Sequence, residues 1–427
     1  MPISKEQALQ IIQRLSQGQS LEALAKRLSP VSESERPFAP EVPSLRDATA
    51  EGRMRRLEFL HARGVEVPHL AGHATAPDPA TLAGNVEQYI GMTQVPTGMI
   101  GPLRVNGLHA HGDFYVPIAT TEGALVASYH RGARLVTQSG GVSSLVTAEQ
   151  VQRAPGFLFD CIADAAHFAA WATGEFEAFR AAAATRTAHG ALIDLQVQVQ
   201  SRNVYLILAY HTGDAAGQNM VTLCTQAVCE DILARAPVRP RGWFLESNMS
   251  GDKKATVLSF LNTRGRRVMA EVKLPRELVE RVLHTTPERM CEYWRLSFIG
   301  GVQSGSIGVS GHIANGLAGI FLATGQDVAC VSEASVGVTV MELTEDGGLY
   351  CGLDLPNLIV GTVGGGTRMP TAAECLRIAE CEGPGQAAKF AEIVAAALLG
   401  GELSIVGALS AGQFARAHEH LGRRGPT

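Results

Sequence analysis

The sequence predicts an α+β fold: a large domain of mixed helix and sheet, a small ferredoxin-like domain inserted into it, and an N-terminal helical arm. The chain has 427 residues, which at roughly 150 residues per domain gives two or three domains. One internal stretch alternates helix-like and strand-like segments, which is typical of a small α+β unit, and a long apolar helix rich in Ala and Gly follows near the C-terminus. We assign the arm to residues 1–49, the large domain to 50–153 and 245–427, and the inserted domain to 154–244.

The composition excludes several classes of protein. Hydrophobic residues make up 46% and charged residues 18% of the chain, as in a folded globular protein. The 36 Lys and Arg residues against 41 Asp and Glu residues leave a net charge of -5, which favours neither nucleic-acid nor membrane-surface binding. The eight cysteines include no Cys-x-x-Cys pair, so we expect reduced thiols, a cytoplasmic location and no metal site.

The arm is expected to be helical at both ends. Apolar residues recur at near-helical spacing in residues 5–27, and a second helix-like stretch begins at Ser44. Between them, residues 29–44 mix Pro, Ser and charged residues, which is typical of a linker.

The large domain is expected to bring a strand directly into a helix near residue 120. The strand-like VPIAT at 116–120 leads into an apolar helical pattern. We expect Thr120 or Thr121 to cap this helix, which would place Glu122 in its first turn, where the helix dipole favours a carboxylate. The apolar stretch 393–412 contains Glu402 and four glycines, which suits a packed helix better than a membrane span.

The inserted domain is expected to hold two strands and two helices. An Ala-rich helix at 163–185 precedes the strands 191–200 and 204–210, and another helix follows them. The sequence GDAAGQNMVT at 213–222 joins the second strand to that helix, and its glycines would let backbone N–H groups approach a phosphate. Alone, this motif also fits an ordinary strand-to-helix turn.

Three further clusters are candidates for a site. GDKK at 251–254 is either a solvated charge run or the source of a buried lysine that stabilises an oxyanion. Asp327 lies in a predominantly apolar stretch, so we expect it to have a cationic partner. GTVGGGT at 361–367 permits close backbone approach to a ligand or another chain. A serine hydrolase fits poorly, because no G-x-S-x-G elbow is present.

Taken in order, the motifs resemble the hydroxymethylglutaryl-CoA (HMG-CoA) reductase family. The resemblance runs from about Asn85 to Arg423, is closer to the class I branch, and covers its catalytic portion without a membrane anchor. Nine matching segments in the family's order carry it: NVEQYIGMTQVPTGMIGPL (85–103), TTEGALVASYHRG (120–132), QRAP (152–155), GDAAGQNMVT (213–222), GDKK (251–254), GHIAN (311–315), ATGQD (323–327), GTVGGGT (361–367) and GELSIVGALSAGQFARAH (401–418).

The resemblance implies a four-electron reduction of HMG-CoA to mevalonate and CoA with two nicotinamide hydrides. The positions that match the family's catalytic set are Glu122, Lys253, Asp327 and His418. Lys253 would stabilise the oxyanion and Asp327 would hold Lys253 charged. His418 would protonate the departing CoA thiolate, and Glu122 would protonate the aldehyde oxygen.

The resemblance also implies binding residues for the cofactor and the substrate. Cofactor residues would be Asp214, Ala215, Gly217, Gln218, Asn219, Met220, Arg186, Gly361 and Thr362. Substrate residues would be Arg131 toward CoA, Arg153, Asp252 and Lys254 toward the acyl group, and His312 and Asn315. NADPH is the expected cofactor. NADH is the alternative, because Thr187 and Ala188 stand where the family has Ser-Arg, with Arg186 beside them. The family's active site lies between subunits, so we expect a homodimer or higher homo-oligomer.

Several positions depart from the family at its acyl-recognition site. The family's lysine that holds the HMG carboxylate falls on Leu296, with Arg295 adjacent, a family serine becomes Glu246, and the usual acidic residue before GTVGGGT is Ile359. Two alternatives therefore stay open. One is the same thioester reduction on a different acyl-CoA or a carrier-bound acyl group. The other is a catalytically silent scaffold relative, against which the four matching catalytic residues argue.

Overall fold

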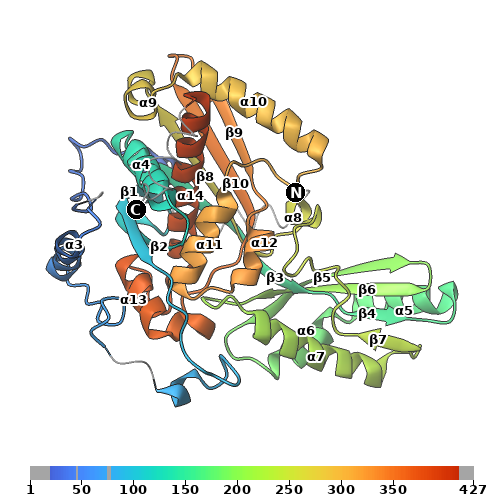
Figure 1. Cartoon of the computed structure of the whole chain (residues 1–427). Helices are drawn as coiled ribbons and strands as arrows, with labels where there is room; N and C mark the ends of the chain where they lie inside the picture. Colours follow the sequence, from blue (N-terminus) through green and yellow to red (C-terminus); the bar gives the residue numbers. More distant parts are fainter. Residues whose placement is uncertain (1–19, 45–46, 75–77, 413–427) are drawn as a thin grey trace.

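The computed structural model describes residues 20–44, 47–74 and 78–412, and its architecture is the expected α+β fold (Figure 1). Its sheet has ten strands. The order along its main path is β7-β4-β6-β3-β8-β10-β9, with β1 beside β3, β2 beside β1, and β5 beside β6. The strands are β1 (Thr97–Gly107), β2 (His111–Ala119), β3 (Val142–Arg153), β4 (Gly156–Leu158), β5 (Ala191–Gln200), β6 (Asn203–His211), β7 (Gly242–Phe244), β8 (Gly265–Leu274), β9 (Val338–Leu343) and β10 (Leu349–Leu358).

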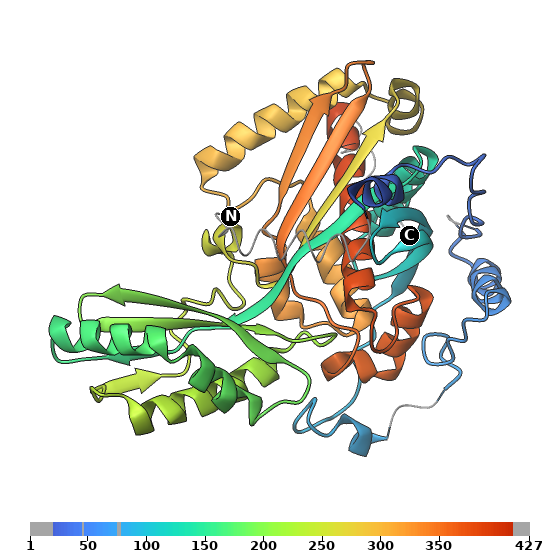
Figure 2. The same cartoon turned by 180° about the vertical axis from the view of Figure 1, so that it is seen from behind.

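Strand β3 joins two parts of the molecule. Its residues 143–150 pair with β8, and its last three residues, 151–153, pair with β6. Figure 2 shows β3 running from the larger body into a smaller one built from β4–β7. Each part has its own apolar cluster, one around β1, β8, β10 and the helix 387–410, the other around β4, β6 and the helix 218–235. A strand shared by two cores fixes the direction in which the smaller body leaves the larger one.

The helices pack on the sheet in both parts. Around the smaller sheet lie α5 (Ile162–Gly174), α6 (Phe176–Ala184) and α7 (Gln218–Arg235). In the larger part are η1 (Pro79–Leu82), α4 (Leu125–Gln138), α8 (Leu258–Leu261), α9 (Arg276–Leu283), α10 (Pro287–Ser304), α11 (Ile313–Thr324), η2 (Val328–Cys330), α12 (Val331–Ala334), η3 (Gly365–Arg368), α13 (Pro370–Ile378) and α14 (Ala387–Ser410). The Ala-rich segment forms two helices rather than the single expected one, because the chain leaves helical geometry at Glu175 between α5 and α6.

The arm contains α2 (Leu21–Leu28) in its described part, and α3 (Ala50–Ala62) follows directly after its assigned end at residue 49. The side chains of Ser20 and Thr49 cap these helices. The linker between them has no regular structure, as predicted. It is attached to the sheet by Arg104, which is fully buried. Arg104 binds Asp113 and donates to the backbone carbonyls of Val31 and Pro37. The N–H of Ala39 also donates to Asp113, and the Tyr115 hydroxyl donates to the Pro40 carbonyl, so several side-chain contacts fix the linker.

The expected helix start near residue 120 is wrong by several residues. Helix α4 begins at Leu125, after Ala124 in the left-handed conformation (φ 72°). The Thr120 hydroxyl accepts the backbone N–H of Glu122 in a tight turn instead of capping the helix. Such a side-chain turn competes with helix initiation. Glu122 therefore lies on an exposed turn before the helix.

Helix α14 runs through the centre of the larger part. By length and composition alone its 24 residues could cross a membrane, but 89% of its most apolar window is buried inside the protein. It packs against α4 where Gly132 faces Gly400, and a Cβ on Gly132 would collide with the Gly400 carbonyl. Two carboxyl groups are buried on this helix, at Glu392 and Glu402. Glu392 accepts the backbone N–H groups of His109 and Ala110 in the β1–β2 turn.

Candidate active site

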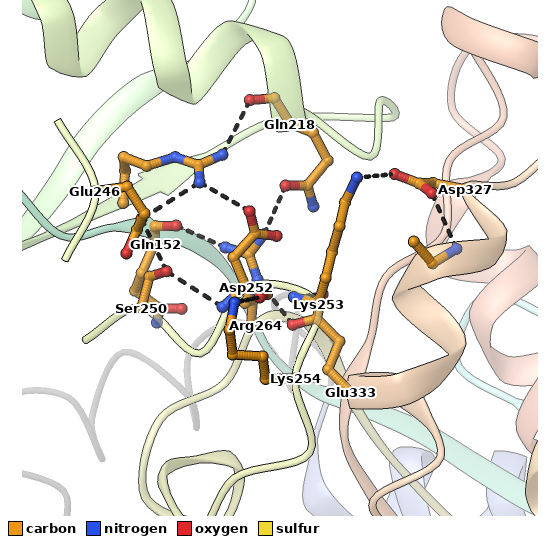
Figure 3. Close-up of polar contacts among 12 residues, drawn as sticks. Gln152, Gln218, Glu246, Ser250, Asp252, Lys253, Lys254, Arg264, Asp327 and Glu333 are labelled. Atoms are coloured by element: carbon orange, nitrogen blue, oxygen red, sulfur yellow. Dashed lines mark hydrogen bonds and ion pairs between the residues drawn. The ribbon is translucent and has the colours of Figure 1, made fainter. Parts of the chain in front are cut away.

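Lys253 and Asp327 form an ion pair, as the sequence predicted for Asp327. Their Nζ and Oδ2 atoms lie 2.9 Å apart (Figure 3). The pair is not buried: the side chains are 43% and 37% exposed. The hydrogen bond to Asp327 raises the pKa of Lys253 above its ordinary value, so the ammonium stays charged at neutral pH. This is a charged donor that a ligand can reach.

Asp327 is positioned by the residue before it. It follows Gly325, which ends α11 in the left-handed conformation. The buried side chain of Gln326 then accepts the backbone N–H of Gly361 at 2.8 Å and donates to the Gly361 carbonyl at 3.0 Å. These two hydrogen bonds attach the Asp327 turn to the start of the glycine-rich segment 361–367.

Lys253 belongs to a loop, residues 246–254, that we call the dilysine loop. Lys253 has a positive φ of 55°, which a lysine adopts only when its surroundings impose it. Its backbone N–H donates to Glu333 Oε1 at 3.0 Å, and Glu333 is fully buried. Burial raises the pKa of Glu333, which the Arg264 guanidinium opposes.

Arg264 is the centre of the polar contacts around this loop. Only 1% of it is exposed. Its guanidinium donates to Glu333 Oε2 at 2.8 Å, to the Gln152 carbonyl at 2.6 Å, to Gln218 Oε1 at 2.5 Å and to Asp252 Oδ1 (Figure 3). Arg264 therefore connects the dilysine loop to β3 and to the start of α7.

Arg153 carries the other side of the same network. Its Nη1 atom lies 2.8 Å from Asp252 Oδ2 and 3.3 Å from Glu246 Oε2. Burial raises the pKa of Asp252, but the Arg264 and Arg153 guanidinium groups outweigh it and hold that pKa below its ordinary value. Lys254 is exposed, and its ammonium donates to the Asp252 carbonyl at 3.0 Å. Five of the predicted site residues thus meet here: Arg153, Gln218, Asp252, Lys253 and Lys254.

The GDAAG loop (residues 213–217) lies beside this network. Gly213 and Gly217 have positive φ values of 59° and 75°. Gly217 precedes α7, and no side chain caps that helix, so its first-turn N–H groups can bind an anion. The Asp214 carboxylate accepts the N–H groups of Gly385 and Ala387 at the start of α14. It is therefore engaged in attaching this loop to α14.

The remaining predicted cofactor residues surround this loop unevenly. Thr362 donates its N–H to the Asp214 carbonyl, and Ala215 pairs with Val363. Gly361 packs so closely on the loop that a Cβ there would collide with the N of Ala216.

The other predicted cofactor residues lie on or near α7. Asn219 is exposed, and Met220 accepts a hydrogen bond from Thr187. Arg186 is half-exposed and 3.7 Å from Glu230. The Nε2 atom of Gln218 is buried without a hydrogen-bond partner in the described part of the chain.

Arg131, predicted to bind CoA, and the predicted substrate residue His312 are attached to α14. Arg131 donates to the Ser404 hydroxyl at 3.0 Å and to the Ser404 carbonyl at 2.7 Å. Glu402 accepts the N–H of Gly311 and, at 2.7 Å, that of His312. Burial raises the pKa of Glu402 to about 7, although these N–H groups oppose the shift. Asn315 follows on the first turn of α11.

His312 is held as a neutral ring. Its Nε2 lies 2.8 Å from the Gly401 carbonyl, so Nε2 carries the proton and donates. Burial lowers the pKa of His312, which keeps the ring neutral at pH 7. His312 therefore positions α11 against α14 in this structure.

The structure does not bring all predicted residues together. Glu122 is exposed on the turn before α4, and none of its described contacts is with Lys253 or Asp327. His418 lies outside the described residues. Leu296 is 70% exposed on α10, whereas Ile359 is a core residue. The sequence analysis missed Arg264, Glu333 and Gln326. Of these three, only Gln326 stands in a recognised motif, ATGQD at 323–327, directly before Asp327.

Comparison with known proteins is consistent with this geometry. The family described as hydroxymethylglutaryl-coenzyme A reductase matches residues 52–423. The 3-hydroxy-3-methylglutaryl-coenzyme A reductase of Methanocaldococcus jannaschii is 41% identical over 376 residues, covering 86% of this chain and 92% of the relative. The protein of the same name from Pyrococcus abyssi is 42% identical over 379 residues, covering 87% and 92%.

The fold has a match among solved structures. The class II 3-hydroxy-3-methylglutaryl-CoA reductase of Streptococcus pneumoniae, solved with NADPH, superposes with a TM-score of 0.68 at 18% identity. The match covers 83% of this chain and 96% of that one. At this identity the comparison supports the fold alone.

Removing Arg264 should destabilise the protein strongly. Arg264→Met leaves the buried Glu333 without its cation, which costs about 3–5 kcal/mol. Arg264→Met combined with Glu333→Gln should recover part of this loss, because the buried charge is gone as well. Urea unfolding measures both. The matched control is Arg276→Met, which removes an exposed pairing with Glu288 and should cost under about 1 kcal/mol. A loss in Arg264→Met no larger than in this control contradicts the role of Arg264.

Proposed function

The chain belongs to the hydroxymethylglutaryl-CoA reductase family, and we propose that it reduces 3-hydroxy-3-methylglutaryl-CoA to mevalonate and CoA with NADPH. The observation that carries this proposal is the Lys253–Asp327 pair, whose charged ammonium is accessible beside the GDAAG loop. Identity of 41–42% to relatives of that name over most of both chains supports it. The retained pair also argues against a catalytically silent scaffold.

The residues around the GDAAG loop fit a dinucleotide cofactor. The uncapped N-terminus of α7 offers backbone N–H groups to a phosphate. The buried Nε2 of Gln218 offers a donor that has no acceptor within the described protein. Bound NADPH supplies the hydride for each of the two reductions. Arg186 is the cation nearest in sequence to the family's missing arginine, and we propose that it selects the 2′-phosphate of NADPH over NADH.

Lys253 has the properties that an oxyanion stabiliser requires. When the thioester carbon becomes tetrahedral, negative charge develops on the acyl oxygen, and a positioned ammonium lowers the energy of that state. Asp327 keeps Lys253 charged, and Glu333 fixes the backbone from which its side chain leaves. We propose the same ammonium for both half-reactions, because an oxygen gains negative charge in each.

Lys253→Ala should lower turnover by about a hundredfold or more, because one preorganised donor to the oxyanion is lost. The measurement is NADPH oxidation at saturating HMG-CoA, with circular dichroism as a check on folding. Lys273→Ala, a lysine on β8 outside the site, is the matched control and should keep its rate. A folded Lys253→Ala protein with near-parental turnover contradicts the assignment.

Glu122 and His418 are proposed as proton donors. His418 has an intrinsic pKa suited to protonating the departing CoA thiolate. Glu122 gives a proton to the aldehyde oxygen in the second reduction. Support for both comes from the family match, which spans residues 52–423 and so includes both positions.

His418→Gln should slow thioester reduction much more than reduction of the free aldehyde, because only the first half-reaction releases a thiolate. Parallel assays with HMG-CoA and with the free aldehyde intermediate measure this difference. His420→Gln, a neighbouring histidine, serves as control. Equal losses on the two substrates would overturn the assignment.

We also propose that the active enzyme is a homo-oligomer whose site is completed by a second copy. Helix α10 exposes a row of apolar side chains on one face: Leu296, Phe298, Ile299 and Val302.

A charge placed on this face of α10 should separate the copies. Light scattering should show a dimer or larger for the parent and an inactive monomer for Ile299→Asp, with Leu343→Asp on β9 as control. An active monomer at assay concentration refutes the proposal. The cytoplasmic location stays a prediction.

A further inference from the structure

The carboxylate of Glu246 is surrounded by donors from three directions. It accepts from Arg153 Nη1 at 3.3 Å, from the backbone N–H of Asn248 at 2.7 Å and from the Ser250 hydroxyl at 3.0 Å. The backbone N–H of Ala154 lies within 3.4 Å of the same Oε2 atom. A guanidinium, two backbone N–H groups and a hydroxyl are what a protein uses to bind a free carboxylate. Here the chain's own side chain occupies them.

The charges around Glu246 also disfavour a further anion. Arg153 binds both Glu246 and Asp252, and Arg264 binds both Asp252 and Glu333. Each guanidinium group is therefore already shared between two carboxyl groups, and both carboxyl partners of Arg153 bind its Nη1 atom. A ligand carboxylate arriving beside Arg153 would meet Glu246, and like charges at such a distance reduce binding.

Glu246 lies where it can act on the substrate without taking part in the chemistry. It begins the loop that ends in Lys253 and Lys254 (Figure 3). Arg153 connects it to Asp252 in the same loop. The Lys253–Asp327 pair is bonded independently of it. A change at Glu246 should therefore alter binding of the acyl end more than the rate of reduction.

We propose that Glu246 determines acyl specificity: by occupying the donors around Arg153, it makes the site favour acyl-CoA substrates whose acyl chain ends in an uncharged group over those that end in a carboxylate. HMG-CoA is turned over, but its distal carboxylate must displace Glu246. The inference rests on the proposed reductase activity and concerns only the acyl group.

The test compares two thioesters that differ in this carboxylate alone, HMG-CoA and 3-hydroxy-3-methylbutanoyl-CoA. Glu246→Gln keeps the size of the side chain and removes its charge. We expect kcat/KM for HMG-CoA, relative to the uncharged thioester, to rise at least tenfold in Glu246→Gln, chiefly through a lower KM. Glu246→Asp, which keeps the charge, should retain the parental preference. The control is Glu345→Gln in the β9–β10 turn, which removes a charge far from Arg153 along the chain.

Two results would overturn the inference. One is a parental protein that prefers HMG-CoA with a KM insensitive to Glu246→Gln. The other is an equal change on both thioesters, which would show a merely structural role. If neither thioester supports NADPH or NADH oxidation in the parent, the proposed reductase activity fails instead. Calorimetric dissociation constants for the two thioesters then still decide the specificity question, because they do not require turnover.

Discussion

The burial of α14 is the constraint on which the arrangement of the site depends. A 24-residue helix surrounded by protein must find partners within the protein for most of its polar groups. Several of these partners are site elements: Asp214 accepts the Ala387 N–H, and Glu402 and Ser404 bond α11 and α4. The glycine contact with α4 sets how near that helix lies. The GDAAG loop, α4 and α11 are thereby fixed relative to one another by their contacts with α14.

A second set of contacts, the ion pairs of Arg153 and Arg264, holds the dilysine loop in place. Burying ions is costly, so the network around Arg264 contributes little to stability compared with an apolar core. What it provides is order: it holds Lys253 at a positive φ and places Asp252 against two guanidinium groups. Asp327 connects these two sets of contacts. It pairs with Lys253, and the adjacent Gln326 bonds Gly361 in the glycine-rich segment. The Lys253–Asp327 pair is therefore held through its backbone, although its side chains are 43% and 37% exposed.

The sequence predicted the motifs of this protein more reliably than the residues that surround them. It predicted a cationic partner for Asp327 and found the partner's motif, because an isolated carboxylate in an apolar stretch requires one. It left open whether the lysine is buried or solvated, and both side chains of the pair are partly exposed, since apolar neighbours in sequence do not cover a residue at the end of a helix. Arg264 and Glu333 escaped notice because they are 69 residues apart and neither stands in a recognisable pattern.

Periodicity and motif order can be read along the chain, so the sequence was enough to predict the α+β class, the strands 191–200 and 204–210, the long apolar helix and the family. It was not enough to predict where α4 begins or how the site residues are held. A turn closed by the Thr120 hydroxyl and a helix capped by it differ in free energy by only about 1 kcal/mol. The sequence pattern cannot tell which of two states so close in energy is formed. The occupation of Arg153 by Glu246 arises from residues 93 positions apart, and such contacts exist only once β3 and the dilysine loop have been folded together.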